Sequence, residues 1–233
     1  MVDRRIALII VPVIALWSYF PARRASADEW KPIDPAELKM TAEPKAPGAN
    51  AIYLYREVDR RDTGRANTEY NYVRIKILKE EGRDAANIVI PYYSDQTRID
   101  GVRARAVRPD GSIVNFDGKV YDKIVEKTKG VKIKAKVFTV PDVQVGSIVE
   151  YHFNYNFEDG YVFSSYWAIS DDLFTKKADL SLVPYTRFAI RWVWPAGLPP
   201  GAEPAKIGPD KIVRMTAHDI PAFQTERLYA AGK

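Results

Sequence analysis

The feature that most constrains the fold is a set of acidic residues that each stand directly before glycine, between runs of alternating character. Glycine adopts a positive φ angle without strain and aspartate tolerates neighbouring turn positions, so an Asp-Gly pair between alternating runs is a strong hairpin signal. In "AVRPDGSIVNF" a proline also fixes φ at the turn entry. The acidic-glycine pairs are Glu81-Gly82, Asp100-Gly101, Asp110-Gly111, Asp117-Gly118 and Asp159-Gly160.

The runs between these turns have the period of two that is typical of β-strands. The segment 51–58, "AIYLYREV", alternates and is rich in β-forming residues. No helical periodicity of any length appears between residues 51 and 217. We therefore predict an all-β fold, an antiparallel β-sandwich of many short strands joined by Asp-Gly and Pro-Asp-Gly turns. In "TEYNYVRIKILK" the alternation places Tyr70, Tyr72 and Arg74 on one side and Val73, Ile75 and Ile77 on the other.

Residues 1–27 are typical of a signal peptide. The charged segment "MVDRR" precedes the apolar run "IALIIVPVIALWSYF", and Ala25-Ser26-Ala27 supplies the small residues that a signal peptidase needs. The apolar run is shorter than the ~20 residues that span a bilayer. Arg23 and Arg24 near the cleavage site leave an uncleaved membrane anchor as the alternative. We expect cleavage near Ala27 and a periplasmic or secreted protein.

The rest of the chain divides into three parts. Residues 28–49 are expected to form an irregular lead-in, rich in proline and alanine, with one helical turn at "PAELKM". Residues 50–217 form the sandwich domain, and residues 218–233 a C-terminal linker or tail. The last strands of the domain are expected at "PYTRFAIRWVWP", with Trp192 and Trp194 on one face, and at "KIVRMTAH".

The composition excludes several functional classes. The chain has no cysteine, which rules out a catalytic thiol, a disulfide framework and a thiolate metal site. Removal of residues 1–27 takes away four arginines and Asp3, so the net charge falls from +5 to +2. So mild a balance gives no argument for nucleic-acid binding.

The pair Glu150 and His152 is the most conspicuous candidate for chemistry. In "IVEYHFNYNF" alternate residues share a face, so both side chains could ligate a metal. A catalytic zinc needs about three protein ligands, and the only other histidine is His218. We therefore expect no metal or other cofactor, and a solvated strand face for this pair. The faces are expected to hold Val149, Tyr151, Phe153, Tyr155 and Phe157 on one side and Ile148, Glu150, His152, Asn154 and Asn156 on the other, more polar side.

Three further patterns each have a functional and a structural interpretation. Ser164, Ser165 and Ser181 could serve a hydrolase, but no G-x-S-x-G turn is present. The fourteen tyrosines and five tryptophans could build a glycan-stacking platform, although aromatic residues at period two more often form core. A row of lysines could contact an anionic envelope surface, or could protect an exposed strand from edge pairing, which we favour. The row is Lys127, Lys129, Lys132, Lys134 and Lys136.

Several blocks in one order carry a resemblance to a known family. They are "AIYLYREV", "TEYNYVRIKILKEEGRDAANIVIPY", "IDGVRARAVRPDGSIVNFDGKVYDKIV" and "KAKVFTVPDVQVGSIVEYHF". Together they resemble the bacterial domain of unknown function found N-terminal to transglutaminase-like cores in exported proteins, over about residues 30–225. The resemblance implies a β-sandwich-like fold, an envelope setting, and a papain-like core with a Cys-His-Asp triad as the usual partner. It supplies no catalytic residue for this chain.

We therefore expect an exported, non-catalytic β-domain that acts as an interaction or accessory module for a transglutaminase-like core, in the same polypeptide or another. The tail sets Ile220, Phe223, Leu228 and Tyr229 among polar residues, and Phe223 and Tyr229 are the candidate partner contacts. The alternatives are a glycan- or peptidoglycan-binding module and a hydrolase whose site the sequence does not reveal.

Overall fold

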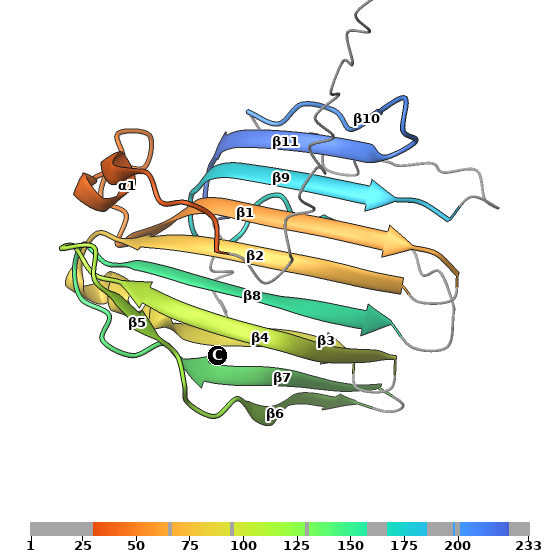
Figure 1. Ribbon diagram of the computed structural model, residues 1–233, viewed down its shortest axis with the longest axis horizontal. Coiled ribbons are helices and arrows are strands. Elements are labelled where there is room, and N and C mark those ends of the chain that lie inside the picture. The colour runs from red at the N-terminus through yellow and green to blue at the C-terminus, as the bar shows by residue number, and fades with distance from the viewer. Residues whose placement is uncertain are drawn as a thin grey trace, which may run out of the picture. The chain divides into compact units, whose positions relative to one another are not determined.

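Two β-sheets make up most of the described chain (Figure 1). The computed structural model describes residues 30–64, 67–93, 96–128, 131–157, 167–185, 198 and 201–223, with the main chain alone for 126–128, 131 and 132. The elements are α1 (Pro35–Lys39), β1 (Ala51–Asp62), β2 (Asn67–Ile77), the 3-10 helix η1 (Glu80–Ala86), β3 (Asn87–Tyr93), β4 (Thr97–Val107), β5 (Ile113–Asn115), β6 (Tyr121–Thr128), β7 (Val131–Thr139), β8 (Ile148–Phe157), β9 (Thr175–Val183), β10 (Lys206–Ile207) and β11 (Val213–Ile220). No helix within these residues is long and apolar enough to cross a membrane.

The large sheet has eight strands in the order β10-β11-β9-β1-β2-β8-β4-β5. Neighbouring strands in this sheet are antiparallel except for β1 and β9, which run parallel, with Val58 opposite Leu180. The all-β prediction is confirmed, but the expectation of a purely antiparallel sheet is wrong at this pair. A parallel pair needs a long crossover between its strands, and the segment from β2 to β8 supplies it.

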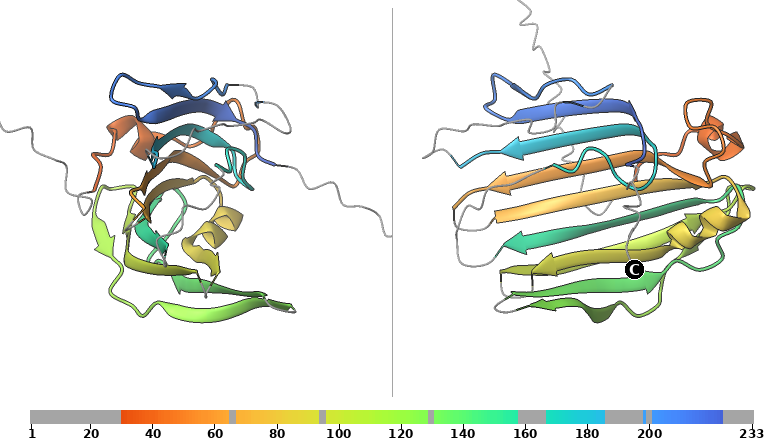
Figure 2. Two further views of the ribbon diagram at one scale, coloured as in Figure 1. Left: turned by 90° about the vertical axis from the view of Figure 1, so that its right-hand side faces the viewer. Right: turned by 180° about the vertical axis from the view of Figure 1, so that it is seen from behind.

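The small sheet has three strands in the order β3-β7-β6 and packs against the large sheet from one side (Figure 2). We call the face of the large sheet that looks toward the small sheet its inner face, and the opposite face its outer face. The main core lies between the two sheets, as the sandwich prediction requires. It includes Ile75, Ile77, Ala104, Ala106, Val149 and Phe153 of the large sheet, and Ile88, Ile90 and Phe138 of the small sheet.

The lead-in crosses the outer face of the large sheet, on the other side from η1 and the small sheet (Figure 2). It contains the expected helical turn, since α1 begins after Asp34, whose side chain accepts a hydrogen bond from the Ala36 amide at 2.8 Å. Such an N-cap stabilises the first turn of a helix. A second apolar cluster forms beneath it, in which Ile33, Leu38 and Met40 pack on Ile52, Leu54, Ile148 and Phe174.

The acidic-glycine turns are confirmed in part. Asp110-Gly111 forms the expected hairpin between β4 and β5, and Gly111 has a φ angle of 85°, which glycine adopts without strain. Asp100-Gly101 forms no hairpin, because it lies inside β4 at a bulge between Asp100 and Arg103, where Gly101 has a φ angle of 62°. Gly82 lies inside η1 and also forms no hairpin. A Cβ atom there would lie 2.0 Å from the Asn50 carbonyl oxygen, so the glycine permits a close backbone approach instead.

The C-terminal part of the sheet differs from the expected boundary. β11 continues through Ile220, which is fully buried, so the strand passes the expected domain end at residue 217. A third apolar cluster covers β9 and β11, where Trp167 and Ile169 pack near Leu180 and Met215. The expected strand with Trp192 and Trp194, the signal peptide and the Asp159-Gly160 turn lie outside the described residues.

Candidate functional site

Glu150 and His152 lie in the interior, which corrects the expected solvated strand face. Glu150 has no exposed surface and His152 is 1% exposed. The sequence assigned the two residues to one face correctly, but β8 lies between β2 and β4 near the middle of the sheet. A central strand is covered on both faces when another segment crosses the sheet, so its polar face is buried here.

Glu150 is the centre of a buried charge cluster. Its Oε1 atom accepts a hydrogen bond from Arg74 Nε at 2.8 Å and a short one from the Tyr72 hydroxyl, and its Oε2 atom accepts from Arg105 Nε at 2.6 Å. The cross-strand register produces this arrangement, because Glu150 stands opposite Arg74 on β2 and Arg105 on β4. Burial is the largest influence and by itself lowers the pKa of Arg74, but Glu150, Tyr72 and Glu37 together outweigh it and raise the pKa.

This arrangement suits structure better than metal chemistry. Both oxygens of Glu150 are engaged by cationic or phenolic donors, and His152 stacks on the Tyr72 ring at 6.5 Å. Within the described part of the chain, no group of three or more histidine, aspartate or glutamate residues could hold a metal ion.

Cations of the outer face also hold the lead-in. Arg74 reaches past Glu150 to donate to Glu37 of α1 at 2.8 Å and to the Pro32 carbonyl at 3.0 Å. Lys76, which is fully buried, donates to the carbonyls of Leu38 at 2.8 Å and Gly146 at 2.5 Å. Burial lowers the pKa of Lys76 to about 8. The lead-in is therefore part of the folded domain and not a loose linker.

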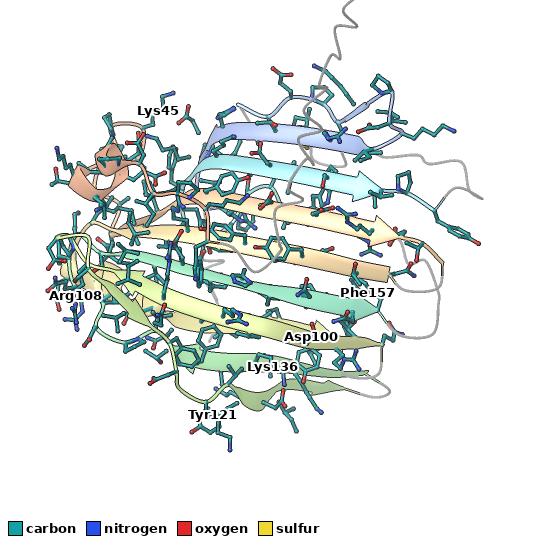
Figure 3. All side chains as sticks on the ribbon, viewed as in Figure 1. Lys45, Asp100, Arg108, Tyr121, Lys136 and Phe157 are labelled. Atoms are coloured by element: carbon teal, nitrogen blue, oxygen red, sulfur yellow. The ribbon has the colours of Figure 1, made fainter. Side chains whose placement is uncertain are left out.

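The small sheet presents the opposite arrangement, an apolar face turned to solvent. In the register of the sheet, Val89, Val137 and Tyr121 form one cross-strand row, and Tyr93 stands opposite Ile133. Val89 is 59% exposed, Tyr121 57% and Tyr93 52%. Tyr121 projects from the lower margin of the molecule in Figure 3. We call this surface the apolar face; it comprises the exposed Val89, Pro91, Tyr93 and Tyr121 and the half-buried Ile133 and Val137.

The lysine row does not protect a sheet edge as expected. Lys132, Lys134 and Lys136 belong to β7, the central strand of the small sheet, whose edges are β3 and β6. Lys136 pairs with Asp122 at 3.0 Å, and the Tyr92 hydroxyl donates to the same carboxylate. Lys127 does lie in the edge strand β6, and Lys129 is outside the described residues.

A small pocket opens beside the main core, on the inner face of the large sheet. Its volume is about 130 Å³. Its floor comes from β1, β2 and β8, one wall from Val89–Pro91 of the edge strand β3, and another from Asp171. We call it the inter-sheet pocket. Its aromatic lining consists of Tyr53, Tyr72, Tyr151, Phe153 and Tyr155.

The expected tail contacts fall partly within the structure. Phe223 is 65% exposed, and its backbone amide donates to the Asp171 carbonyl at 2.6 Å, close to the pocket. Tyr229 lies outside the described residues, as do Ser164 and Ser165. Ser181 lies in β9 and donates to Asp59 at 3.2 Å. Neither the pocket nor the apolar face could be found from local sequence, because each combines residues from strands far apart in the chain.

Comparison with solved structures places the fold within larger proteins. The chain is similar to a "putative protease" from Parabacteroides distasonis ATCC 8503, with a TM-score of 0.58 and 15% identity over 79% of this chain and 38% of that one. Native leukotriene A4 hydrolase from Saccharomyces cerevisiae matches with a TM-score of 0.39 and 13% identity, over 81% of this chain and 32% of that one. An M1 zinc metallopeptidase from Deinococcus radiodurans matches with a TM-score of 0.30 and 8% identity, over 78% of this chain and 42% of that one.

The chain thus spans less than half the length of these solved structures. No curated protein matches its sequence. A family match covers residues 65–224, from the start of β2 to the end of β11. The chain therefore belongs to the family described as a domain of unknown function with solved structure, DUF3857.

Proposed function

We propose that this chain is an exported, non-catalytic β-domain that docks on a transglutaminase-like core, in the same polypeptide or in a partner chain. The observation that carries the proposal is the apolar face of the small sheet. Soluble monomers rarely expose large contiguous apolar patches, and such patches commonly mark interaction sites. Val89, Tyr93 and Tyr121 keep more than half of their surface in solvent while the other face of the same sheet packs in the main core.

The surroundings of the apolar face indicate the character of the partner surface. Lys119 lies over the Tyr121 ring at 5.3 Å, and Lys123 is exposed on the same strand. An apolar patch with lysines at its margin fits a partner surface that is apolar at its centre and carries carboxylates at its rim. Contacts between domains of one chain bury about 600–1,500 Å² in this way.

The identity of the partner rests on the sequence blocks that resemble domains N-terminal to transglutaminase-like cores. The fold comparison is compatible with it, since a similar fold makes up 38% of a larger chain described as a "putative protease". A domain that forms part of a larger enzyme chain can position or shield the catalytic part without contributing a catalytic residue.

A binding measurement tests the docking. We expect this chain to bind a separately expressed transglutaminase-like core from the same genome, and Val89→Asp and Tyr121→Asp to weaken the binding at least ~10-fold, as loss of a buried interface anchor does. Ile113→Asp is the matched control, because Ile113 is 52% exposed but belongs to β5 of the large sheet. Phe223→Asp tests the tail separately. Absence of binding to every encoded core at high micromolar concentration would remove the proposal.

Export is the second part of the proposal and has its own test. The charged start, the apolar run and Ala25-Ser26-Ala27 predict cleavage after Ala27. N-terminal sequencing of protein from the envelope fraction should begin at Asp28. A mature chain that still begins at Met1 would favour the membrane anchor.

A further inference from the structure

The inter-sheet pocket has the size of a site for one small ring. Pockets for drug-sized ligands occupy about 300–1,000 Å³, whereas this one holds about 130 Å³. That volume corresponds to a few water molecules of ~30 Å³ each. Its aromatic residues are held firmly, since Phe153 packs edge-on against Tyr155 at 5.1 Å and stacks on Tyr151 at 6.3 Å.

Two polar groups in the pocket have hydrogen-bonding capacity to spare. The Tyr151 hydroxyl has no hydrogen-bond partner among the described residues, and burial raises its pKa, so it stays a neutral phenol. The Asn71 amide nitrogen donates to Glu69 Oε1 at 3.1 Å. Among the described residues, no group donates a hydrogen bond to Asn71 Oδ1. A phenol and an amide oxygen together offer one donor and two acceptor groups to a ligand.

Three charged side chains line the pocket, Arg56, Glu57 and Asp171, and two of them pair with each other. Arg56 pairs with Asp171 at 3.1 Å and donates to the Ile169 carbonyl at 3.4 Å, while its guanidinium lies over the Tyr53 ring at 5.1 Å. The Tyr53 hydroxyl donates to Asp172 at 3.3 Å. Burial and the neighbouring Asp171 raise the pKa of Asp172 above its ordinary value. The charge of Arg56 is therefore already matched by Asp171, so an anionic ligand would gain little in this pocket, whereas a neutral ligand with hydroxyl groups would not disturb the ion pair.

We infer that the inter-sheet pocket binds one neutral pyranose ring, as a free sugar or as the end of a glycan. A pyranose has an apolar C–H face that packs on tyrosine and phenylalanine rings, and a rim of hydroxyls that can both donate and accept. The Tyr151 hydroxyl and Asn71 Oδ1 would contact that rim, and the rings of Tyr53 and Tyr155 would contact the apolar face. This site borders the apolar face at Val89 and Pro91 but lies on the inner face of the large sheet, and the inference does not depend on docking to a core.

Titration of the isotopically labelled full chain with methyl glucoside, methyl galactoside and N-acetylglucosamine, each to ~10 mM, tests the inference by NMR. We expect at least one sugar to shift the resonances of Tyr151 and Asn71. Tyr151→Phe should weaken its binding about 2- to 10-fold, the effect of one neutral hydrogen bond. Asn71→Leu should weaken it similarly while keeping the side-chain volume close to that of asparagine.

Tyr121→Phe is the matched control, because Tyr121 lies outside the pocket on the apolar face, and its binding should equal that of the wild type. Thermal melts of all three variants establish that each is folded. The inference is overturned if none of the sugars binds, if a charged probe such as lysine methyl ester or acetate binds there instead, or if Tyr151→Phe and Asn71→Leu bind as the wild type does. A bound sugar that shifts only residues of the apolar face would also contradict it.

Discussion

The outer face of the large sheet buries charged side chains, whereas the apolar face of the small sheet exposes hydrophobic ones. Both are the reverse of what is usual in a soluble protein. On the large sheet, Glu150, Arg74 and Lys76 lie in the interior beneath a crossing segment. On the small sheet, Val89 and Tyr121 stand in solvent. The difference shows that burial on a sheet depends on what covers the face. Covered charges must then be paired, as Glu150 and Arg74 are, or hydrogen-bonded to the backbone, as Lys76 is, because an uncompensated charge in the interior is very costly.

Among substitutions that test this difference between the two faces, Glu150→Ala should cause the largest loss of stability. The substitution leaves Arg74 and Arg105 without their shared carboxylate in a buried setting. Removal of one partner from a buried ion pair typically costs about 3–5 kcal/mol in the free energy of unfolding. Urea denaturation measures the loss, with the exposed Glu81→Ala as the control. A change in Glu150→Ala no larger than in the control would mean that water reaches this part of the outer face.

The pH dependence of stability tests the second buried charge. Burial lowers the pKa of Lys76 from 10.5 to about 8, so the unfolded chain binds this proton more tightly than the folded one. Stability should therefore rise as the pH increases from about 8, by at most ~3 kcal/mol by pH 10.5. Above about pH 10 the buried tyrosines oppose this rise, because burial raises the pKa of Tyr53 and Tyr151 and they ionise first in the unfolded chain.

Denaturation between pH 7.5 and 9.5 avoids the tyrosine range, and Lys76→Met supplies the control. The methionine variant should lose the rise in stability with pH, although it also loses the hydrogen bonds to Leu38 and Gly146. A wild-type profile that is flat over this range would show that Lys76 keeps an ordinary pKa in the folded protein.

Removal of the N-cap of α1 should cause a smaller loss of stability. This change tests how firmly the lead-in is attached to the outer face of the large sheet. Asp34→Ala takes away the acceptor for the Ala36 amide and should destabilise the domain by about 0.5–2 kcal/mol, if the lead-in unfolds together with the sheet. Asp34→Ser keeps an oxygen acceptor and should retain most of the stability. Equal stability of the alanine variant and the wild type would indicate that the lead-in detaches before the domain unfolds.

The smallest effect is expected on the apolar face. Val89→Thr and Tyr121→Ser remove apolar surface from exposed positions, and each should change the unfolding free energy by no more than about 0.5 kcal/mol. Both should reduce binding of the dye ANS, because less apolar surface is presented to solvent. A loss of several kcal/mol in either variant would mean that this face is covered in the isolated chain.

Local patterns in the sequence predicted the fold class, the helical turn in the lead-in and the alternation of faces in β2 and β8. They could not predict which strand is central, because neighbours in a sheet are chosen by long-range pairing. That is why Glu150 and His152 were expected in solvent. The signal that could have corrected this lay in β2, where the charged Arg74 and Lys76 alternate with Ile75 and Ile77, and Arg74 supplies part of the charge that a buried Glu150 requires.

The parallel pairing of β1 with β9 has a consequence for the order of folding. Val58 and Leu180 are joined across most of the domain sequence, so the entropy of closing this loop must be overcome before the contact forms. Among the described strands, the pairing of β9 with β1 is the only connection between β9, β10 and β11 and the rest of the large sheet. Until β9 pairs with β1, β1 is an unpaired edge strand of the folding chain and can pair with a strand of another molecule. During synthesis the domain would remain prone to aggregation until β9 has left the ribosome.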